Sequence, residues 1–182
     1  MVHRRRGTEA RYQPSKMQYK YKRENQIWHV FDVIGWNYKS QLHFYTGSGK
    51  GGRLMQVDYI KFLEDVVAPD WDTSLILLED NDRAHGTKSK PTSQVNQTKL
   101  RLGITCESNP PVSPDLNPIE GIWRMVKQRL KNRGVFFNKL DLRRAIEEEW
   151  DKVSLEDIHE SISTMPARVQ ALIARNGGSI PY

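Results

Sequence analysis

Residues 113–130 read SPDLNPIEGIWRMVKQRL, and this stretch decides how the chain around it is interpreted. A polar loop with prolines runs into a helix, with Asn117 expected as its cap and Pro118 at its first helical position. Apolar residues recur there at helical spacing and predict a buried stripe. The stripe comprises Ile119, Ile122, Trp123, Val126 and Leu130.

Glu120 falls in the first turn of this helix, three residues after Asn117. A glutamate at that position is typical of a capping box, and the helix dipole favours a carboxylate there. The pattern alone favours that structural role. The functional alternative is that Glu120 binds a metal ion together with a second carboxylate from elsewhere in the chain.

The second carboxylate is Asp80, forty positions before Glu120. It follows an apolar run, residues 74–79, that shows little polar alternation and predicts a central strand covered on both faces. Ligands of open α/β sheets gather beyond the carboxyl ends of such strands. Asp80 is therefore a candidate metal ligand, although an Asp-Asn pair at this point also suits a simple turn.

The remaining patterns predict a mixed α/β layer architecture. Strands are expected at 27–34 and 42–45, forming a hairpin about a turn at 35–38, and a short strand is expected at 104–107. Helices are expected at 57–67, at 91–103 as a polar surface helix, around 142–153, and from a capping box at Ser154 and Asp157 onward. We divide the chain into a basic segment, 1–26, and one domain, 27–182.

Composition narrows the class of partner. The chain has 182 residues, a net charge of +6 and a pI near 9.4, which favour a nucleic acid or another anionic surface. No apolar run approaches the ~20 residues that span a bilayer, so no membrane partner is expected. A single cysteine, Cys106, excludes an internal disulfide framework and fits a reducing compartment.

Basic residues gather in two places, and both are candidate DNA contacts because cations on phosphates position a duplex. In each place the alternative is an ordinary solvated surface. The candidates are Arg4, Arg5 and Arg6 near the N-terminus and Arg124, Lys127, Arg129 and Lys131 after Glu120.

Asp80 and Glu120 would suit Mg²⁺ or Mn²⁺, since Mg²⁺ takes a few carboxylates together with water and phosphate oxygens. Two such ions about 4 Å apart activate the attacking oxygen and stabilise the leaving one in phosphodiester cleavage. His85, five residues after Asp80, is a candidate to orient a scissile phosphate or a water. Its alternative is a solvent-facing loop histidine.

Asp80-Asn81 with His85, and Ser113–Glu120 followed by Trp123 and Lys127, resemble the second and third catalytic segments of mariner-type DNA transposases, in the DDE superfamily. Residues 164–168 resemble the C-terminal signature of that family. The resemblance implies a ribonuclease-H-like mixed sheet with flanking helices. It also implies Mg²⁺-dependent DNA cleavage and strand transfer by three carboxylates. The implied partners are double-stranded DNA, as transposon ends and target, and a second copy in a homodimer.

The chain departs from the family at two points. Met1 begins where the family's first strand, which carries the first aspartate, should have ended, so that strand is expected to be missing. Phe31-Asp32 replaces the family's Trp-Gly, and Asp32 is not expected to substitute, because it lies on the neighbouring strand.

We therefore expect an N-terminally truncated transposase domain that is weak or inactive alone. The alternative is a non-catalytic DNA-binding or oligomerisation remnant of a transposase. A nuclear location is expected in a eukaryote, and a cytoplasmic one otherwise.

Overall fold

The computed structural model describes residues 2–3, 18–19, 27–86, 89–111, 113–178 and 180. In the basic N-terminal segment, β1 (Val2–His3) pairs with β2 (Gln18–Tyr19) in antiparallel fashion. The arginines proposed there as DNA contacts, Arg4, Arg5 and Arg6, lie outside the described residues. Their role stays a prediction.

The predicted hairpin is confirmed. Strand β3 (His29–Phe31) pairs antiparallel with β6 (His43–Tyr45), and the shorter strands β4 (Ile34–Gly35) and β5 (Tyr38–Lys39) pair inside it. β-Branched and aromatic residues favour these extended segments because they pack well on a pleated surface. The turn between β4 and β5 falls within the predicted range 35–38.

Strand β7 (Ile76–Glu79) pairs in parallel with β8 (Thr105–Ser108). Helix α1 (Gln56–Phe62) precedes β7 and continues as a wider helical turn over Leu63–Val67, as the 57–67 pattern predicts. Helix α2 (Gln94–Arg101) lies in the connection from β7 to β8, which suits a parallel pair because such strands need a long crossover. The polar helix predicted at 91–103 is present, and one of its faces is buried through Val95, Thr98 and Lys99.

Four helices complete the fold: α3 (Ile119–Asn132), α4 (Lys139–Asp151), α5 (Leu155–Ser163) and α6 (Met165–Ala174). The capping box at the start of α5 is confirmed, with Ser154 and Asp157 each accepting from the other's backbone N–H. Helix α3 begins one residue later than predicted, with Pro118 at its N-cap position, and the Asn117 Oδ1 just before it accepts from the backbone N–H of Ile119 at 3.3 Å. Among the described residues, no helix has the length and apolar character needed to cross a bilayer.

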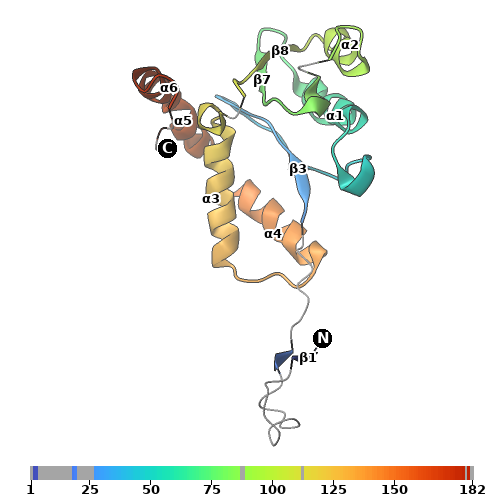
Figure 1. The fold of residues 1–182 in the computed structure, drawn as a ribbon, viewed down its shortest axis with the longest axis vertical. Helices are drawn as coiled ribbons and strands as arrows, with labels where there is room; N and C mark the ends of the chain where they lie inside the picture. The colour runs from blue at the N-terminus through green and yellow to red at the C-terminus, as the bar shows by residue number, and fades with distance from the viewer. Residues whose placement is uncertain are drawn as a thin grey trace, which may run out of the picture.

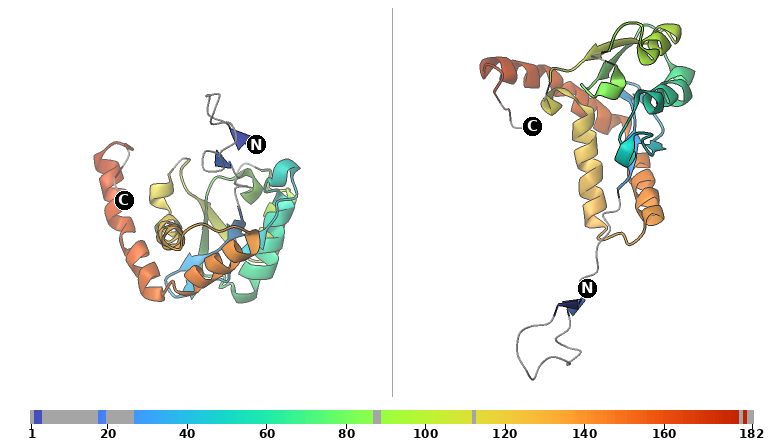
Figure 2. Two further views of the ribbon diagram at one scale, coloured as in Figure 1. Left: turned by 90° about the horizontal axis from the view of Figure 1, so that it is seen from below. Right: turned by 45° about the vertical axis from the view of Figure 1, so that its right-hand side comes forward.

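The core falls into two clusters, which lie on different sides of β3 and β4. The first cluster comprises residues of α1, α2 and β7 with Phe31 and Val33 packed against them. The second comprises residues of α3, α4 and α5 with Ile34 and Leu42 packed against them. Figures 1 and 2 show α3, α5 and α6 on one side of β3, and α1, α2, β7 and β8 on the other.

Lys39 joins the hairpin to the end of α4. Its Nζ donates to the carbonyl oxygens of Trp150 and Val153 at 3.1 and 2.8 Å, and the Trp150 indole donates to the Ser40 carbonyl at 3.0 Å. A cation at a helix C-terminus also stabilises the helix dipole. These contacts hold α4, and through it α3, against the strands.

The prediction that both faces of β7 are covered is wrong for the described part of the chain. Leu77 is buried against α1, whereas Leu75, Ile76 and Leu78 are 51%, 60% and 45% exposed. The apolar residues of the run do not distinguish one face of the strand from the other, but in the structure α1 and α2 cover only one of these faces. The second core cluster does not include any residue of β7.

Candidate active site

A cavity of about 510 Å³ lies between β3–β4, β7 and the start of α3. It brings together the three predicted catalytic residues, Asp80, Glu120 and His85, which come from three segments of the chain. Most of the remaining lining is apolar, and it includes further carboxylates: Asp32, Asp70, Glu79 and Asp82. A pocket with apolar walls and a few convergent polar groups is the usual setting for a ligand or a reaction.

Asp80 and His85 form one unit at the end of β7. Asp82 caps the short 3-10 turn Arg83–His85 by accepting from the backbone N–H of Ala84 at 2.8 Å. This turn brings His85 back toward the strand, so that its Nδ1 lies 2.8 Å from Asp80 Oδ1. Asp82 therefore has a structural role in the loop, and it also lines the cavity.

Asp80 and His85 each favour the charged form of the other. The hydrogen bond from His85 lowers the pKa of Asp80, so the carboxylate is ionised at neutral pH. Burial works to lower the pKa of His85, but the hydrogen bond and the charge of Asp80 outweigh it and raise the pKa. The Asp80 side chain is 64% exposed and the His85 side chain only 12%. The Asp80 carboxylate is therefore accessible to a ligand, and the buried His85 ring fixes its orientation.

A buried ion pair that the sequence analysis missed supports this unit. Lys99 of α2 donates from Nζ to Glu79 Oε2 at 2.6 Å and to the His85 carbonyl at 2.7 Å. The Tyr59 hydroxyl donates to the other oxygen of Glu79. The signal in the sequence was Glu79 itself, a charged residue that completes an apolar strand and needs a buried partner.

Glu120 is positioned by close packing of α3 against α5. A Cβ at the adjacent Gly121 would lie 2.9 Å from Ser161 Oγ, so a larger residue there would require the Ser161 side chain to shift. The Ser161 hydroxyl donates to the Pro118 carbonyl at 2.7 Å, just before the first turn of α3. Glu120 thus sits on a rigid helix start at the edge of the cavity.

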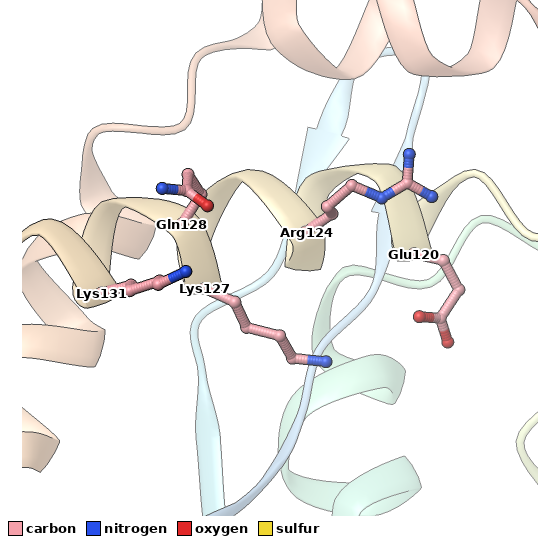
Figure 3. A pocket seen from close by; sticks show the side chains of 5 residues that line it. All are labelled: Glu120, Arg124, Lys127, Gln128 and Lys131. Atoms are coloured by element: carbon pink, nitrogen blue, oxygen red, sulfur yellow. The ribbon is translucent and has the colours of Figure 1, made fainter.

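A second pocket, of about 350 Å³, runs along α3 from Glu120 and is lined by Arg124, Lys127, Gln128 and Lys131. Figure 3 shows these side chains following one another along the helix, with Glu120 at its N-terminal end. Three of the four predicted DNA contacts on this helix therefore share one surface. Arg129 does not line it: its Nη2 lies 4.0 Å from Asp157 Oδ2 of α5.

Asp32 lies in the same cavity as Asp80 and Glu120, although the sequence analysis did not expect it to share their site. Its Oδ1 accepts from the Trp123 indole N–H at 3.0 Å, and its Oδ2 is buried without a hydrogen-bond partner among the described residues. Burial raises the pKa of Asp32 to about 7; the Trp123 hydrogen bond opposes this shift and the charge of Glu120 adds to it. The sequence feature that could have indicated it is an aspartate within the strand predicted at 27–34, most of whose residues are apolar.

The donor set of the cavity suits a hard cation. Asp80 and Glu120 offer carboxylate oxygens, which Mg²⁺ prefers, and water and a substrate phosphate complete such a site. Within the described ranges, no group of three or more His, Cys, Asp or Glu side chains is arranged to hold a metal ion.

The chain is similar in sequence to known transposases. The chain is 38% identical to the Tc1 transposase of Caenorhabditis elegans over 112 residues, which cover 59% of this chain and 37% of that protein. It is 27% identical to the Tcb1 transposase of Caenorhabditis briggsae over 136 residues, covering 72% of this chain and 47% of that protein. The chain thus spans between about a third and a half of these curated relatives.

Solved structures show the same fold. The catalytic domain of Mos1 transposase with raltegravir and Mg superposes with a TM-score of 0.68 at 16% identity, covering 85% of this chain and 77% of that one. The Mos1 strand transfer complex gives a TM-score of 0.67 at 16% identity, covering 98% of this chain and 51% of that one. The family model of the DDE superfamily endonucleases matches residues 4–143, and the chain therefore belongs to that superfamily.

Proposed function

We propose that this chain is the catalytic domain of a mariner-type transposase and that it acts on double-stranded DNA at transposon ends and targets. The observation that carries the proposal is the meeting of Asp80 and Glu120 at one cavity, although they lie forty positions apart in the chain. The relatives named as transposases support the substrate class.

We propose Asp80 and Glu120 as the ligands of Mg²⁺ or Mn²⁺; the Mos1 structures named with Mg and with Mn support a divalent ion. A bound ion would polarise a phosphodiester and activate the attacking oxygen. His85 orients Asp80 through the 2.8 Å contact and keeps it ionised. The apolar walls of the cavity limit the access of water to the phosphate.

The surface along α3 is proposed as the DNA path. Glu120, Arg124, Lys127 and Lys131 are spaced by four, three and four residues and so share one helix face. At 1.5 Å per residue, the basic stripe extends about 16 Å from Glu120. Phosphates bound along it would lead a DNA strand to the carboxylates. Arg129, paired toward α5, is proposed to contribute less.

We also propose that the pairs β3–β6 and β7–β8 belong to one ribonuclease-H-like mixed sheet; the Mos1 fold supports this arrangement. A homodimer and a nuclear location in a eukaryote stay proposals of the same kind. So does the division between the basic segment 1–26 and the domain 27–182.

Metal binding and cleavage test the catalytic proposal. Mn²⁺ binding, followed by electron paramagnetic resonance in the presence of a nicked duplex, should weaken at least tenfold in Asp80→Asn and Glu120→Gln. Glu160→Gln, the same change on an exposed residue of α5, is the matched control and should bind as the wild type does. Metal-dependent nicking by this chain alone is expected to be weak, and any such nicking should be lost in the same two variants. Equal Mn²⁺ binding by Glu120→Gln and Glu160→Gln would reject the site.

The alternative is a non-catalytic DNA-binding remnant, which the basic stripe on α3 also favours. It predicts salt-sensitive DNA binding that is indifferent to metal and to Glu120→Gln. Lys127→Gln should lower the salt slope of duplex binding by about 0.9, since one phosphate contact is lost. Lys61→Gln, on the exposed surface of α1, is its control. DNA binding without metal-dependent nicking selects the remnant.

A further inference from the structure

A glycine-rich loop joins β6 to α1 and does not line either pocket described above. It reads GSGKGGR over residues 47–53, and the side chains of Lys50 and Arg53 are exposed. The Gly49 N–H donates to the Arg53 carbonyl at 3.0 Å, which closes the loop on itself. A Cβ at Gly47 or Gly49 would lie 2.3 or 2.8 Å from that carbonyl oxygen, so the chain needs glycine to make this turn.

Asp58 of α1 anchors the loop. Its Oδ2 accepts hydrogen bonds from the Ser48 N–H at 2.9 Å, the Ser48 hydroxyl at 3.0 Å and the Met55 N–H at 2.8 Å. Three donors on one carboxylate oxygen offset much of its negative charge. The charge that the loop presents to a partner is therefore that of Lys50 and Arg53.

The tip of the loop leaves its backbone uncovered. Gly51 and Gly52 have φ angles of 72° and 79°, and a Cβ at either would meet no atom of the described residues within 4 Å. Glycines with positive φ in open space let a ligand approach the backbone N–H groups closely. Proteins bind DNA phosphates through such N–H groups together with lysine and arginine side chains. The tip, with Lys50 before it and Arg53 after it, therefore suits a phosphate.

A second segment adds two cations beside this loop. The Gln56 side-chain amide donates to the Ser89 hydroxyl at 2.8 Å and joins the start of α1 to the chain after His85. Asn96 of α2 fixes that chain by donating to the Lys90 carbonyl at 3.1 Å. We call the combined region the α1 surface; its exposed cations are Lys50, Arg53, Arg83 and Lys90. Within the described residues, no ion pair involves any of these four cations.

The α1 surface lies beside Asp80, on the other side of β3 from α3. Burial raises the pKa of Tyr45, and the charges of Asp82, Asp58 and Asp80 raise it further, so the loop anchor and the Asp80 turn lie near one hydroxyl. Figure 1 shows α1 and α3 on opposite sides of β3. A duplex bound along the basic stripe of α3 would therefore leave the α1 surface open to a second one.

We propose that the α1 surface binds the phosphates of a second DNA duplex, while the stripe along α3 binds the first. The proposal rests on the proposed function, in which a transposon end and a target must reach the same carboxylates. Because the contacts are to phosphates, binding at the α1 surface should depend strongly on salt and little on base sequence.

The test counts duplexes on the full 182-residue chain by native mass spectrometry with one short duplex in excess. The wild type should bind two duplexes per chain. The double variant Lys50→Gln with Arg53→Gln should bind the second duplex at least tenfold more weakly and the first within twofold of the wild type. By fluorescence anisotropy, the salt slope of the second step should fall by about 1.8, since two phosphate contacts are lost.

The matched control is the double variant Lys61→Gln with Arg101→Gln, which makes the same change of charge on α1 and α2. These side chains are 68% and 60% exposed and pair with Asp65 and Glu64, so both binding steps should match the wild type. Equal weakening by the loop variant and this control would overturn the proposal. One duplex per chain in the wild type, or two duplexes only on a dimer, would also overturn it.

A second pair of variants tests whether a phosphate reaches the tip of the loop. Gly51→Asp and Gly51→Asn both tolerate a positive φ and differ only in charge, and the open space at Gly51 accommodates either side chain. Gly51→Asp should weaken the second step at least tenfold more than Gly51→Asn, and equal effects would contradict the proposal. If these variants do not fold, the change of Lys50 and Arg53 decides alone.

Mn²⁺ binding separates this proposal from the proposed function. It depends on Asp80 and Glu120, so the loop variants should bind Mn²⁺ as the wild type does. Loss of the second duplex with intact Mn²⁺ binding supports the α1 surface, whereas a change in Mn²⁺ binding in the loop variants would assign the loop to the carboxylate site and overturn it. An unchanged second step in Asp80→Asn would show that the α1 surface binds DNA even if the metal site fails.

Discussion

Replacing Lys99 with methionine should destabilise this protein severely, because the lysine neutralises a carboxylate inside the core. Lys99 and Glu79 are 9% and 3% exposed, and their charged atoms lie 2.6 Å apart. Lys99→Met keeps most of the side-chain volume but leaves Glu79 with the Tyr59 hydroxyl as its remaining hydrogen-bond donor among the described contacts. The carboxylate must then either stay charged in the core or take up a proton.

Breaking a buried pair by removing one partner costs about 3–5 kcal/mol. Lys99 also donates to the His85 carbonyl at 2.7 Å, and loss of that bond adds to the cost. Since whole domains are stable by only about 5–15 kcal/mol, this change alone removes a large share of the stability. In urea, with m near 1–3 kcal/mol/M, the unfolding midpoint should fall by roughly 1–5 M.

The double variant Lys99→Met with Glu79→Gln separates this explanation from simple loss of packing. Glutamine keeps an acceptor for Tyr59 but carries no charge, so most of the lost stability should return. Lys61→Met is the control: its ion pair with Asp65 lies on the surface, with side chains 68% and 48% exposed, so solvent screens it and its loss should barely move the unfolding midpoint. A loss below 1 kcal/mol in Lys99→Met, or a double variant no more stable than the single one, would refute the reasoning.

Three further predictions concern the walls of the cavity. Burial raises the pKa of Asp32 from an ordinary 3.8 to about 7, so the folded protein binds this proton more tightly than the unfolded chain does. The stability that the protonated Asp32 contributes is complete below about pH 4 and is lost as the pH rises through 7. Asp32→Asn, which keeps the acceptor for Trp123, should therefore flatten the pH profile of stability and exceed the wild type by roughly 2–4 kcal/mol above pH 7 in urea unfolding; an unchanged profile would contradict it. The His85 ring should titrate above pH 6.5 by NMR, and its midpoint should fall in Asp80→Asn, because the raised pKa comes from Asp80; the same midpoint in both proteins would show that Asp80 does not set it. Gly121→Ala should cost about 1–3 kcal/mol of thermal stability through overpacking against Ser161, and adding Ser161→Ala should recover part of it; a neutral Gly121→Ala would mean that α3 and α5 separate easily.

Local patterns were sufficient for the individual elements. The stripe from Ile119 to Leu130 predicted α3, and Ile122 and Val126 are indeed buried. The Ser154 and Asp157 capping box predicted the start of α5. β-Branched and aromatic residues before a turn at 35–38, and a second strand after it, predicted the hairpin. Each of these features depends on residues within one or two turns of each other, so spacing and side-chain type are enough to specify it.

The resemblance to the transposase family indicated Asp80, Glu120 and His85 as site candidates, and the structure brings all three to one cavity. Their roles as ligands and auxiliary stay proposals. The sequence could not predict the hydrogen bonds and ion pairs that surround these side chains. Asp32 accepts a hydrogen bond from Trp123, which lies 91 positions further along the chain. Lys99 pairs with Glu79 only because the fold places α2 beside the end of β7.

The sequence by itself determined the identity and type of the main elements and the superfamily, because helix periodicity, caps and catalytic motifs are written in contiguous residues. Only the tertiary structure decided which charges are buried, which face of β7 is left open, and that Arg129 turns toward α5 while Lys127 and Lys131 share a pocket with Glu120. The physical reason is that burial and charge pairing depend on neighbours that lie far apart in the chain. An apolar run such as residues 74–79 has the same sequence pattern whether the fold covers one face of its strand or both faces.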